Sequence, residues 1–180
     1  NDDGTVWTFK IRDNKWTDGK EVTAEDYAYG IRQTLNPDAG SPNSFFTADF
    51  IKNGAKVVNG EASVDELGVK VVDDKTLEIT LEAPTPYFMS LTDTRACYPV
   101  RQDIAEQHGE TYGSEADKYV SNGPFKVESW KHNSEVSLVK NPDYWDAENV
   151  KLDKVKYSIN TDETAVFNSI DSGQLDWCST

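Results

Sequence analysis

The chain has 180 residues, enough for one ordinary domain or two small ones. Its five Trp, eight Tyr and seven Phe are more aromatic residues than disordered segments carry, so we expect a folded protein. The net charge of −14 repels nucleic-acid phosphates and anionic lipid head groups, which argues against a nucleic-acid partner. No apolar stretch approaches the length of a bilayer span.

The first elements predict a strand followed by a capped helix. Apolar and polar residues alternate over 5–12, which is typical of a half-buried strand. Thr23 with Asp26 three residues later forms a capping box, and Asn36 before a proline ends the helix. The buried stripe of this helix is expected at Tyr27, Ile31 and Leu35.

Later elements are short and mixed, which predicts the α+β class. A last helix is expected to be capped by Thr161 and ended by Gly173. The others, in chain order, are a short helix near Phe45, Phe46 and Phe50, a β-hairpin of 69–72 and 76–81, a helix over 103–109, strands over 125–130 and 135–140, and a strand through Val155, Tyr157 and Ile159.

The sequence shows no arrangement typical of catalysis. His108 and His132 lie in polar contexts without metal-ligand spacing, and neither GxSxG nor a phosphate-binding glycine loop occurs. Cys97 and Cys178 could form a disulfide, but two free buried thiols are the favoured interpretation. Adjacent carboxylates, such as those at 25–26 and 73–74, fall at a helix start and in a hairpin turn, where capping and turn formation explain them. We therefore expect no enzyme, no metal and no cofactor.

A series of motifs in order resembles the extracellular solute-binding proteins of family five, the peptide-binding family. The resemblance covers nearly the whole chain. It is carried by 6–12 (VWTFKIR), 15–20 (KWTDGK), 22–26 (VTAED), 36–37 (NP), 41–42 (SP), 68–81 (GVKVVDDKTLEITL), 84–88 (PTPYF), 121–125 (SNGPF), 140–145 (KNPDYW) and 172–176 (SGQLD). The stretches at 41–42 and 84–88 are most similar to the oligopeptide-binding branch.

This resemblance implies a periplasmic-binding-protein-like type II fold with two lobes that close over the ligand. By resemblance, residues 1–101 make most of an extra small α+β domain, and residues 102–180 belong to the first lobe. We expect the chain to be a fragment that lacks its start and the whole second lobe. The tryptophans at 7, 16, 130 and 145 and Tyr144 are assigned to the core that defines the family.

The resemblance also places four candidate ligand-binding residues. Asn43 follows the Ser41-Pro42 pair, where close relatives place an aromatic residue against the ligand. Thr94 matches a second position of the pocket wall, and Phe45 and Arg95 are added because they are adjacent to these positions.

The function implied is the extracytoplasmic capture of oligopeptides for the permease subunits of an ABC importer, by a monomer. The protein would be periplasmic or a cell-surface lipoprotein, touching the membrane only through a lipid anchor outside residues 1–180. Alternatives are a receptor of the same family for nickel, an oligosaccharide or an opine, a carboxylate-based glycosidase, and a regulator that carries this domain behind a DNA-binding head.

Overall fold

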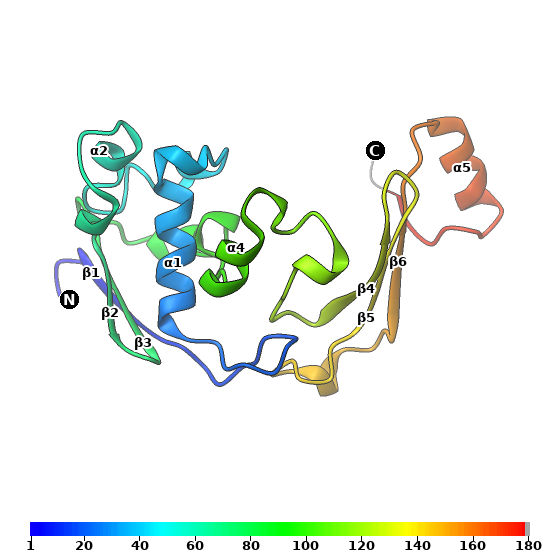
Figure 1. The fold of residues 1–180 in the computed structure, drawn as a ribbon, viewed down its shortest axis with the longest axis horizontal. Helices are drawn as coiled ribbons and strands as arrows, with labels where there is room; N and C mark the ends of the chain where they lie inside the picture. Colours follow the sequence, from blue (N-terminus) through cyan, green and yellow to red (C-terminus); the bar gives the residue numbers. More distant parts are fainter. Residues whose placement is uncertain (179–180) are drawn as a thin grey trace.

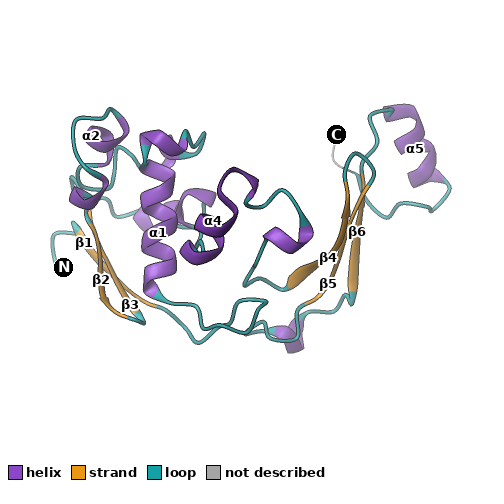
Figure 2. Cartoon of the chain, in the orientation of Figure 1, coloured by secondary structure: helices purple, strands orange, loops and turns teal. Residues whose placement is uncertain are grey.

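The computed structural model describes residues 1–178 and contains two three-stranded antiparallel sheets, one near each end of an elongated molecule (Figures 1 and 2). The first sheet has the order β1-β3-β2 and the second β4-β5-β6. The strands are β1 (Val6–Lys10), β2 (Val69–Asp73), β3 (Thr76–Thr80), β4 (Phe125–Lys131), β5 (Glu135–Lys140) and β6 (Lys154–Ser158). The α-helices are α1 (Ala24–Leu35), α2 (Gly54–Val58), α3 (Phe88–Leu91), α4 (Gln102–His108) and α5 (Glu163–Asp171). Mixed short strands and helices confirm the α+β class.

The first sheet and α1 enclose the main hydrophobic core. Strand β3 lies between β1 and β2, and its Leu77 and Ile79 are buried against α1. The cross-strand partners of these two residues on β1 are Phe9 and Trp7, which pack on the same core. The alternation seen in the sequence therefore marks the face that is covered by the helix.

Helix α1 begins and ends where the sequence predicts. The Thr23 N–H donates to Asp26 Oδ2 at 2.8 Å, and the Asp26 N–H donates back to Thr23 Oγ1 at 3.4 Å. Ile31 and Leu35 are buried, whereas Tyr27 is half-buried at the edge of a pocket. The capping box is confirmed, and Asn36 in extended conformation ends the helix before the proline.

Helix α5 follows the second sheet in the chain, and its N-terminal capping residue is not the one that the sequence predicts. Asp162, not Thr161, is the capping residue, because its Oδ1 accepts from the Ala165 N–H at 3.1 Å. A carboxylate at this position also stabilises the positive end of the helix dipole, which a threonine hydroxyl does less well. Gly173 follows the helix with φ of 73°, as expected.

Two crossing segments join the halves of the molecule. The Thr17 N–H donates to the Ser121 carbonyl at 2.8 Å, and Asn14 Nδ2 donates to the Asn122 carbonyl at 3.0 Å. The adjacent Gly123 has no positive φ, and nothing lies within 4 Å of the place that a Cβ would take. The crossing therefore does not depend on a glycine there. The division at residue 101 stays a prediction.

The five aromatic residues assigned to the core differ in how deeply the structure buries them. Trp16 is 2% exposed and donates its Nε1–H to Asp26 Oδ2, so its assignment is confirmed. Trp145 is 50% exposed, and its assignment to the core is wrong. Its ring lies under the Arg12 guanidinium instead, where a cation–π contact replaces burial. The remaining three are half-buried: Trp7, Trp130 and Tyr144.

Among residues 1–178, none of the helices is both long and apolar enough to cross a bilayer. The longest of them in that part of the chain is α1, with 12 residues.

Arg101 is a buried ion, and its replacement tests the link between the crossing segment at Asp18 and the start of α4. Its guanidinium holds the Asp103 pKa well below the usual range, with Lys20 adding to the effect. A carboxyl with a lowered pKa stabilises the fold above pH 4 and loses this contribution as pH falls further. We expect Arg101→Met to reduce the free energy of unfolding by roughly 2 kcal/mol at pH 7, less than for a fully buried pair because both carboxylates are partly exposed. Thermal unfolding at pH values from 7 to 3 measures this loss of stability. The difference in stability between the variant and the wild type should shrink below pH 4.

The control for this experiment is Lys20→Met, which removes an exposed partner of Asp103 and should change stability by about 0.5 kcal/mol or less. Equal losses for the two variants would contradict the central role of Arg101.

Gly30 lets α1 approach the chain at Tyr98. A Cβ at Gly30 would overlap the Tyr98 carbonyl oxygen, which is backbone and cannot rotate away. We expect Gly30→Ala to reduce stability by roughly 2 kcal/mol, although alanine favours a helix by about 1 kcal/mol. Gly123→Ala is the matched control, since nothing lies near that position. Denaturant unfolding measures both, and a stabilised Gly30→Ala would contradict the close contact.

Candidate functional site

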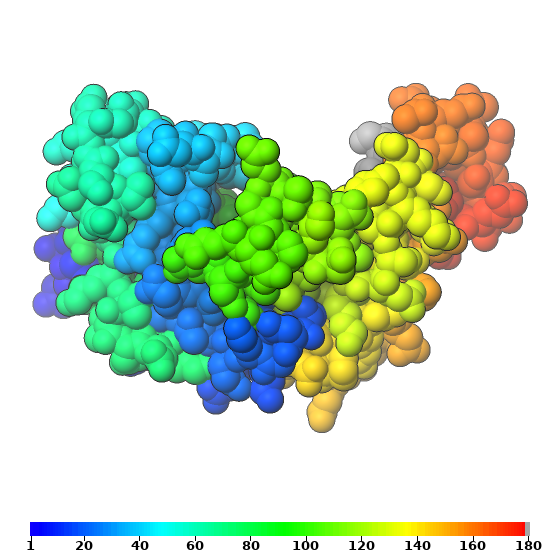
Figure 3. All heavy atoms as spheres, viewed as in Figure 1, coloured from blue at the N-terminus to red at the C-terminus, as the bar shows by residue number. Residues whose placement is uncertain are grey.

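The molecule has a concave face between its two halves. In the space-filling view a hollow opens between the segment that carries α4 on one side and the β4–β5 hairpin on the other (Figure 3). The segment 37–46 lies beyond the C-terminal end of α1 (Figure 1), and in the space-filling view this part of the chain lies beside the α4 side of the hollow, at its rim (Figure 3). A ligand held between the two halves would lie in this hollow and contact its rim.

Asn43 and Phe45 lie in one tight turn of the segment 37–46. The Asn43 N–H donates to Ser41 Oγ at 3.3 Å, and its carbonyl accepts from the Phe46 N–H at 3.2 Å. The Asn43 side-chain amide has no hydrogen bond to any described residue. The Phe45 ring is 64% exposed and stacks on Phe46 with centroids 4.0 Å apart. An unpaired amide and an exposed ring are groups that a ligand can contact.

Thr94 and Arg95 lie in a second segment, which also packs on α1. The Thr94 hydroxyl donates to the Leu91 carbonyl at 2.8 Å, so only its acceptor lone pairs remain available. Arg95 opens a short 3₁₀ turn, is exposed, and forms no ion pair within the described residues. No hydrogen bond joins this segment to Asn43 or Phe45 in the described part of the chain. The structure thus places the four residues in two separate segments.

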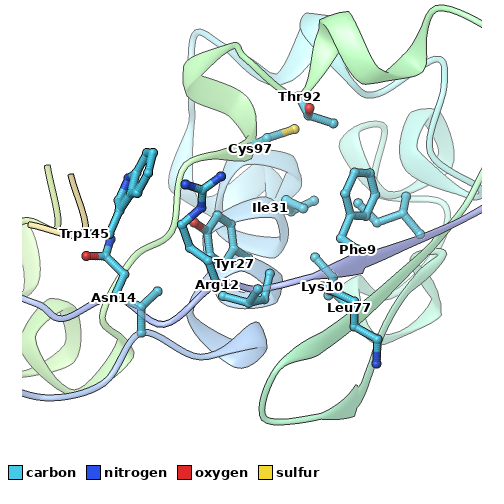
Figure 4. Close-up of a pocket in the computed structure, with 13 residues that line it drawn as sticks. Phe9, Lys10, Arg12, Asn14, Tyr27, Ile31, Leu77, Thr92, Cys97 and Trp145 are labelled. Carbon is cyan, nitrogen blue, oxygen red and sulfur yellow. The ribbon is translucent and has the colours of Figure 1, made fainter. Parts of the chain in front are cut away.

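A pocket of about 280 Å³ lies between β1 and α1, which the sequence did not predict (Figure 4). The Arg12 guanidinium lies 3.8 Å from the centroid of the Trp145 ring at one side of this pocket. Its lining is Phe9, Lys10, Ile11, Arg12, Asn14, Val22, Tyr27, Ile31, Leu77, Ile79, Thr92, Cys97 and Trp145. Arg12 and Trp145 are 133 positions apart by their numbers, and no spacing rule in a sequence reveals such a contact.

Cys97 in this pocket is a buried thiol rather than a nucleophile. Burial raises its pKa to about 11, so it is protonated at neutral pH. Cys97 and Cys178 are both free, which confirms the favoured interpretation over a disulfide. Cys178 is half-buried, however, and not fully buried as expected.

The carboxylate pairs have structural roles. Asp26 caps α1, and Glu25 accepts from Arg32 Nη1 at 2.9 Å. Asp73 accepts from the Lys75 N–H in the β2–β3 turn. These contacts agree with the capping and turn roles that the sequence predicts.

The histidines form no metal site in the described structure. His132 stacks on Trp130 and lies 3.2 Å from a Glu115 oxygen. Within residues 1–178, no group of three or more His, Cys, Asp or Glu side chains is placed to hold a metal ion.

Comparison with known proteins decides which family this architecture represents. The model of the bacterial extracellular solute-binding proteins, family 5 middle, matches residues 1–180. The chain belongs to this family. The dipeptide-binding protein DppE of Bacillus subtilis is 39% identical over 97% of the chain and 32% of its own length.

Two solved structures share the fold. The substrate-binding domain of an oligopeptide ABC transporter from Bacillus anthracis has a TM-score of 0.92 and 41% identity, covering 98% of this chain and 34% of that one. OppA of Listeria monocytogenes, bound to peptide, has a TM-score of 0.90 and 37% identity, covering 98% of this chain and 35% of that one. The chain therefore spans about a third of the length of these relatives, and its fold is that of the matching part of their substrate-binding domain.

The chemical reactivity of the two thiols tests whether Cys97 is buried in the pocket. With a pKa of about 11, only about one Cys97 thiol in a thousand is ionised at pH 8. We expect iodoacetamide to alkylate Cys178 at pH 8 while Cys97 stays unmodified, as measured by peptide mass spectrometry. Both thiols should react once urea unfolds the protein. Equal alkylation in the folded state would contradict the burial of Cys97.

Proposed function

We propose that this chain is part of an extracytoplasmic solute-binding protein that captures oligopeptides and delivers them to the permease of an ABC importer. The observation that supports it best is the likeness to the Listeria protein, which was solved with a peptide bound and shares this fold at 37% identity. The name of the Bacillus subtilis relative, a dipeptide-binding protein, points to the same class of ligand.

The proposed contacts come from two segments, the turn of Asn43 and Phe45 at the rim of the hollow and the turn of Thr94 and Arg95. The Asn43 amide can donate to a peptide carbonyl and accept from a peptide N–H, since an amide offers both groups. The exposed Phe45 ring offers an apolar platform for a ligand side chain. Arg95 suits an acidic side chain or a carboxylate, and Thr94 can only accept, because its hydroxyl proton is already used.

Binding without chemistry agrees with the rest of the structure. The carboxylates at 25–26 and 73 are engaged in caps, ion pairs and turns. A general acid or base must instead be free to exchange a proton with the substrate. We propose that the protein is no enzyme, acts as a monomer, and reaches the membrane through a lipid anchor or works in the periplasm. Nickel, sugar or opine ligands have no observation in their favour here.

Calorimetry with the full-length protein tests the proposal. We expect heat from a mixture of tri- to pentapeptides, and an affinity for peptides with large apolar side chains that falls roughly fivefold in Phe45→Ala, because the platform is lost. Phe167→Ala is the matched control: this ring is similarly exposed but lies on α5, and its loss should leave peptide affinity unchanged.

No heat from peptides, with heat from nickel or an oligosaccharide instead, would reject the peptide assignment. Equal losses in Phe45→Ala and Phe167→Ala would reject the rim as the contact surface while leaving peptide binding intact.

A further inference from the structure

Three Asn-Gly pairs occur in the chain, at 53–54, 59–60 and 122–123. An asparagine that precedes glycine readily loses its side-chain amide, because glycine has no side chain to hinder attack by its own backbone nitrogen on the asparagine Cγ. The attack needs that nitrogen and the asparagine side chain to be free to approach each other. The folded structure therefore decides which of the three pairs can react.

The first pair is held by the fold at both reacting groups. Asn53 Nδ2 donates to the Glu66 carbonyl at 2.8 Å, and the Gly54 N–H donates to the Ile51 carbonyl at 2.7 Å. Gly54 is also buried, and a Cβ at this position would overlap neighbouring backbone. Two hydrogen bonds must therefore break before Asn53 can react.

The second pair is held at one reacting group only. Asn59 follows helix α2, is exposed, and has no hydrogen-bond partner for its side chain among residues 1–178. The Gly60 N–H donates to the Val57 carbonyl at 2.9 Å. This bond must break before the nitrogen can attack, and the net strength of an ordinary hydrogen bond slows such a step by about tenfold.

The third pair is free at both reacting groups. Within the described residues, neither the Asn122 side-chain amide nor the Gly123 N–H has a hydrogen-bond partner. Both residues are only half-buried, and nothing lies within 4 Å of the place that a Cβ on Gly123 would take. The carbonyl groups of this pair are held instead, by Asn14 Nδ2 at 3.0 Å and by Asn141 Nδ2 at 2.9 Å. Of the three pairs, this one leaves the reacting groups most available.

We propose that Asn122 is a site of spontaneous deamidation, with water as the only co-reactant. The Gly123 nitrogen loses its proton to water and forms a bond to the Asn122 Cγ, which closes a succinimide ring. The bond from Cγ to the side-chain nitrogen breaks, and this nitrogen takes up a proton from water and leaves as ammonia. Water then adds to one of the ring carbonyl carbons and opens the ring, which gives aspartate or isoaspartate.

Isoaspartate at this position changes the crossing between the two halves of the molecule. Its main chain runs through the former side-chain carbons, so it is longer, and the former main-chain carbonyl becomes a free carboxylate. That carbonyl is the acceptor of Asn14 Nδ2, and the preceding carbonyl, of Ser121, accepts from the Thr17 N–H at 2.8 Å. The longer chain and the added charge therefore weaken the contacts that join the halves.

Incubation of the full-length protein at pH 8, followed by peptide mass spectrometry, tests the proposal. We expect amide loss at Asn122 to be roughly tenfold faster than at Asn59, where one hydrogen bond must break, and amide loss at Asn53 to be the slowest. In urea the three sites should react at similar rates, because the Asn-Gly sequence is the same. Equal rates in the folded protein, or a rate at Asn122 as slow as at Asn53, would overturn the proposal.

The variant Gly123→Ala separates the reaction from the fold. Its added Cβ meets no neighbouring atom but hinders the attack on Asn122, so this site should stay unmodified while Asn59 reacts as in the wild type. After prolonged incubation, the Tm of the wild type should fall by roughly 2 °C more than the Tm of the variant, because a hydrogen bond at the crossing is lost.

Two results with this variant would overturn the proposal. Amide loss at Asn122 that continues in Gly123→Ala would show that the Gly123 nitrogen is not the attacking group. An equal fall of Tm in the incubated wild type and variant would show that modification leaves the crossing intact. Neither result bears on whether peptides bind at the rim of the hollow.

Discussion

The guanidinium of Arg101 between two carboxylates is the interaction that anchors the segment through which the two halves meet. Its Nε and Nη2 donate to the two oxygens of Asp103 at 2.7 Å each, and its Nη1 donates to Asp18 at 2.9 and 3.1 Å. The side chain is only 5% exposed, so these bonds compensate for most of its lost hydration. One buried ion thereby ties the turn after Trp16 to the start of α4.

The rest of the concave face depends on this join. The segment around Thr17 is held to Ser121 by hydrogen bonds in both directions, and Arg12 in the same crossing lies against Trp145. These contacts fix β4 and β5 relative to α1, and so define the width of the hollow (Figure 3). A rigid wall favours the binding proposed above, because an ordered site loses less conformational entropy when a ligand binds.

The described residues provide surfaces for binding rather than groups for a reaction. The buried thiol of Cys97 is protonated, and the acidic pairs are engaged in helix caps and turns. The groups that stay available for binding at the described surface are the Asn43 side-chain amide, which no described residue pairs, and the exposed Phe45 ring. Both are groups through which we propose that a ligand is held and released.

The sequence alone determined the local structure and the family. The capping box at Thr23, the alternation in β1 and β3 and the order of the motifs depend on neighbouring residues, so they can be read without coordinates. The cap at Asp162 was missed by one position, because threonine and aspartate are both good caps and the choice depends on backbone geometry. Only the tertiary structure decided which residues meet across the chain: Arg12 with Trp145, and Arg101 with Asp18. Such contacts join positions far apart in sequence, and packing rather than periodicity decides them.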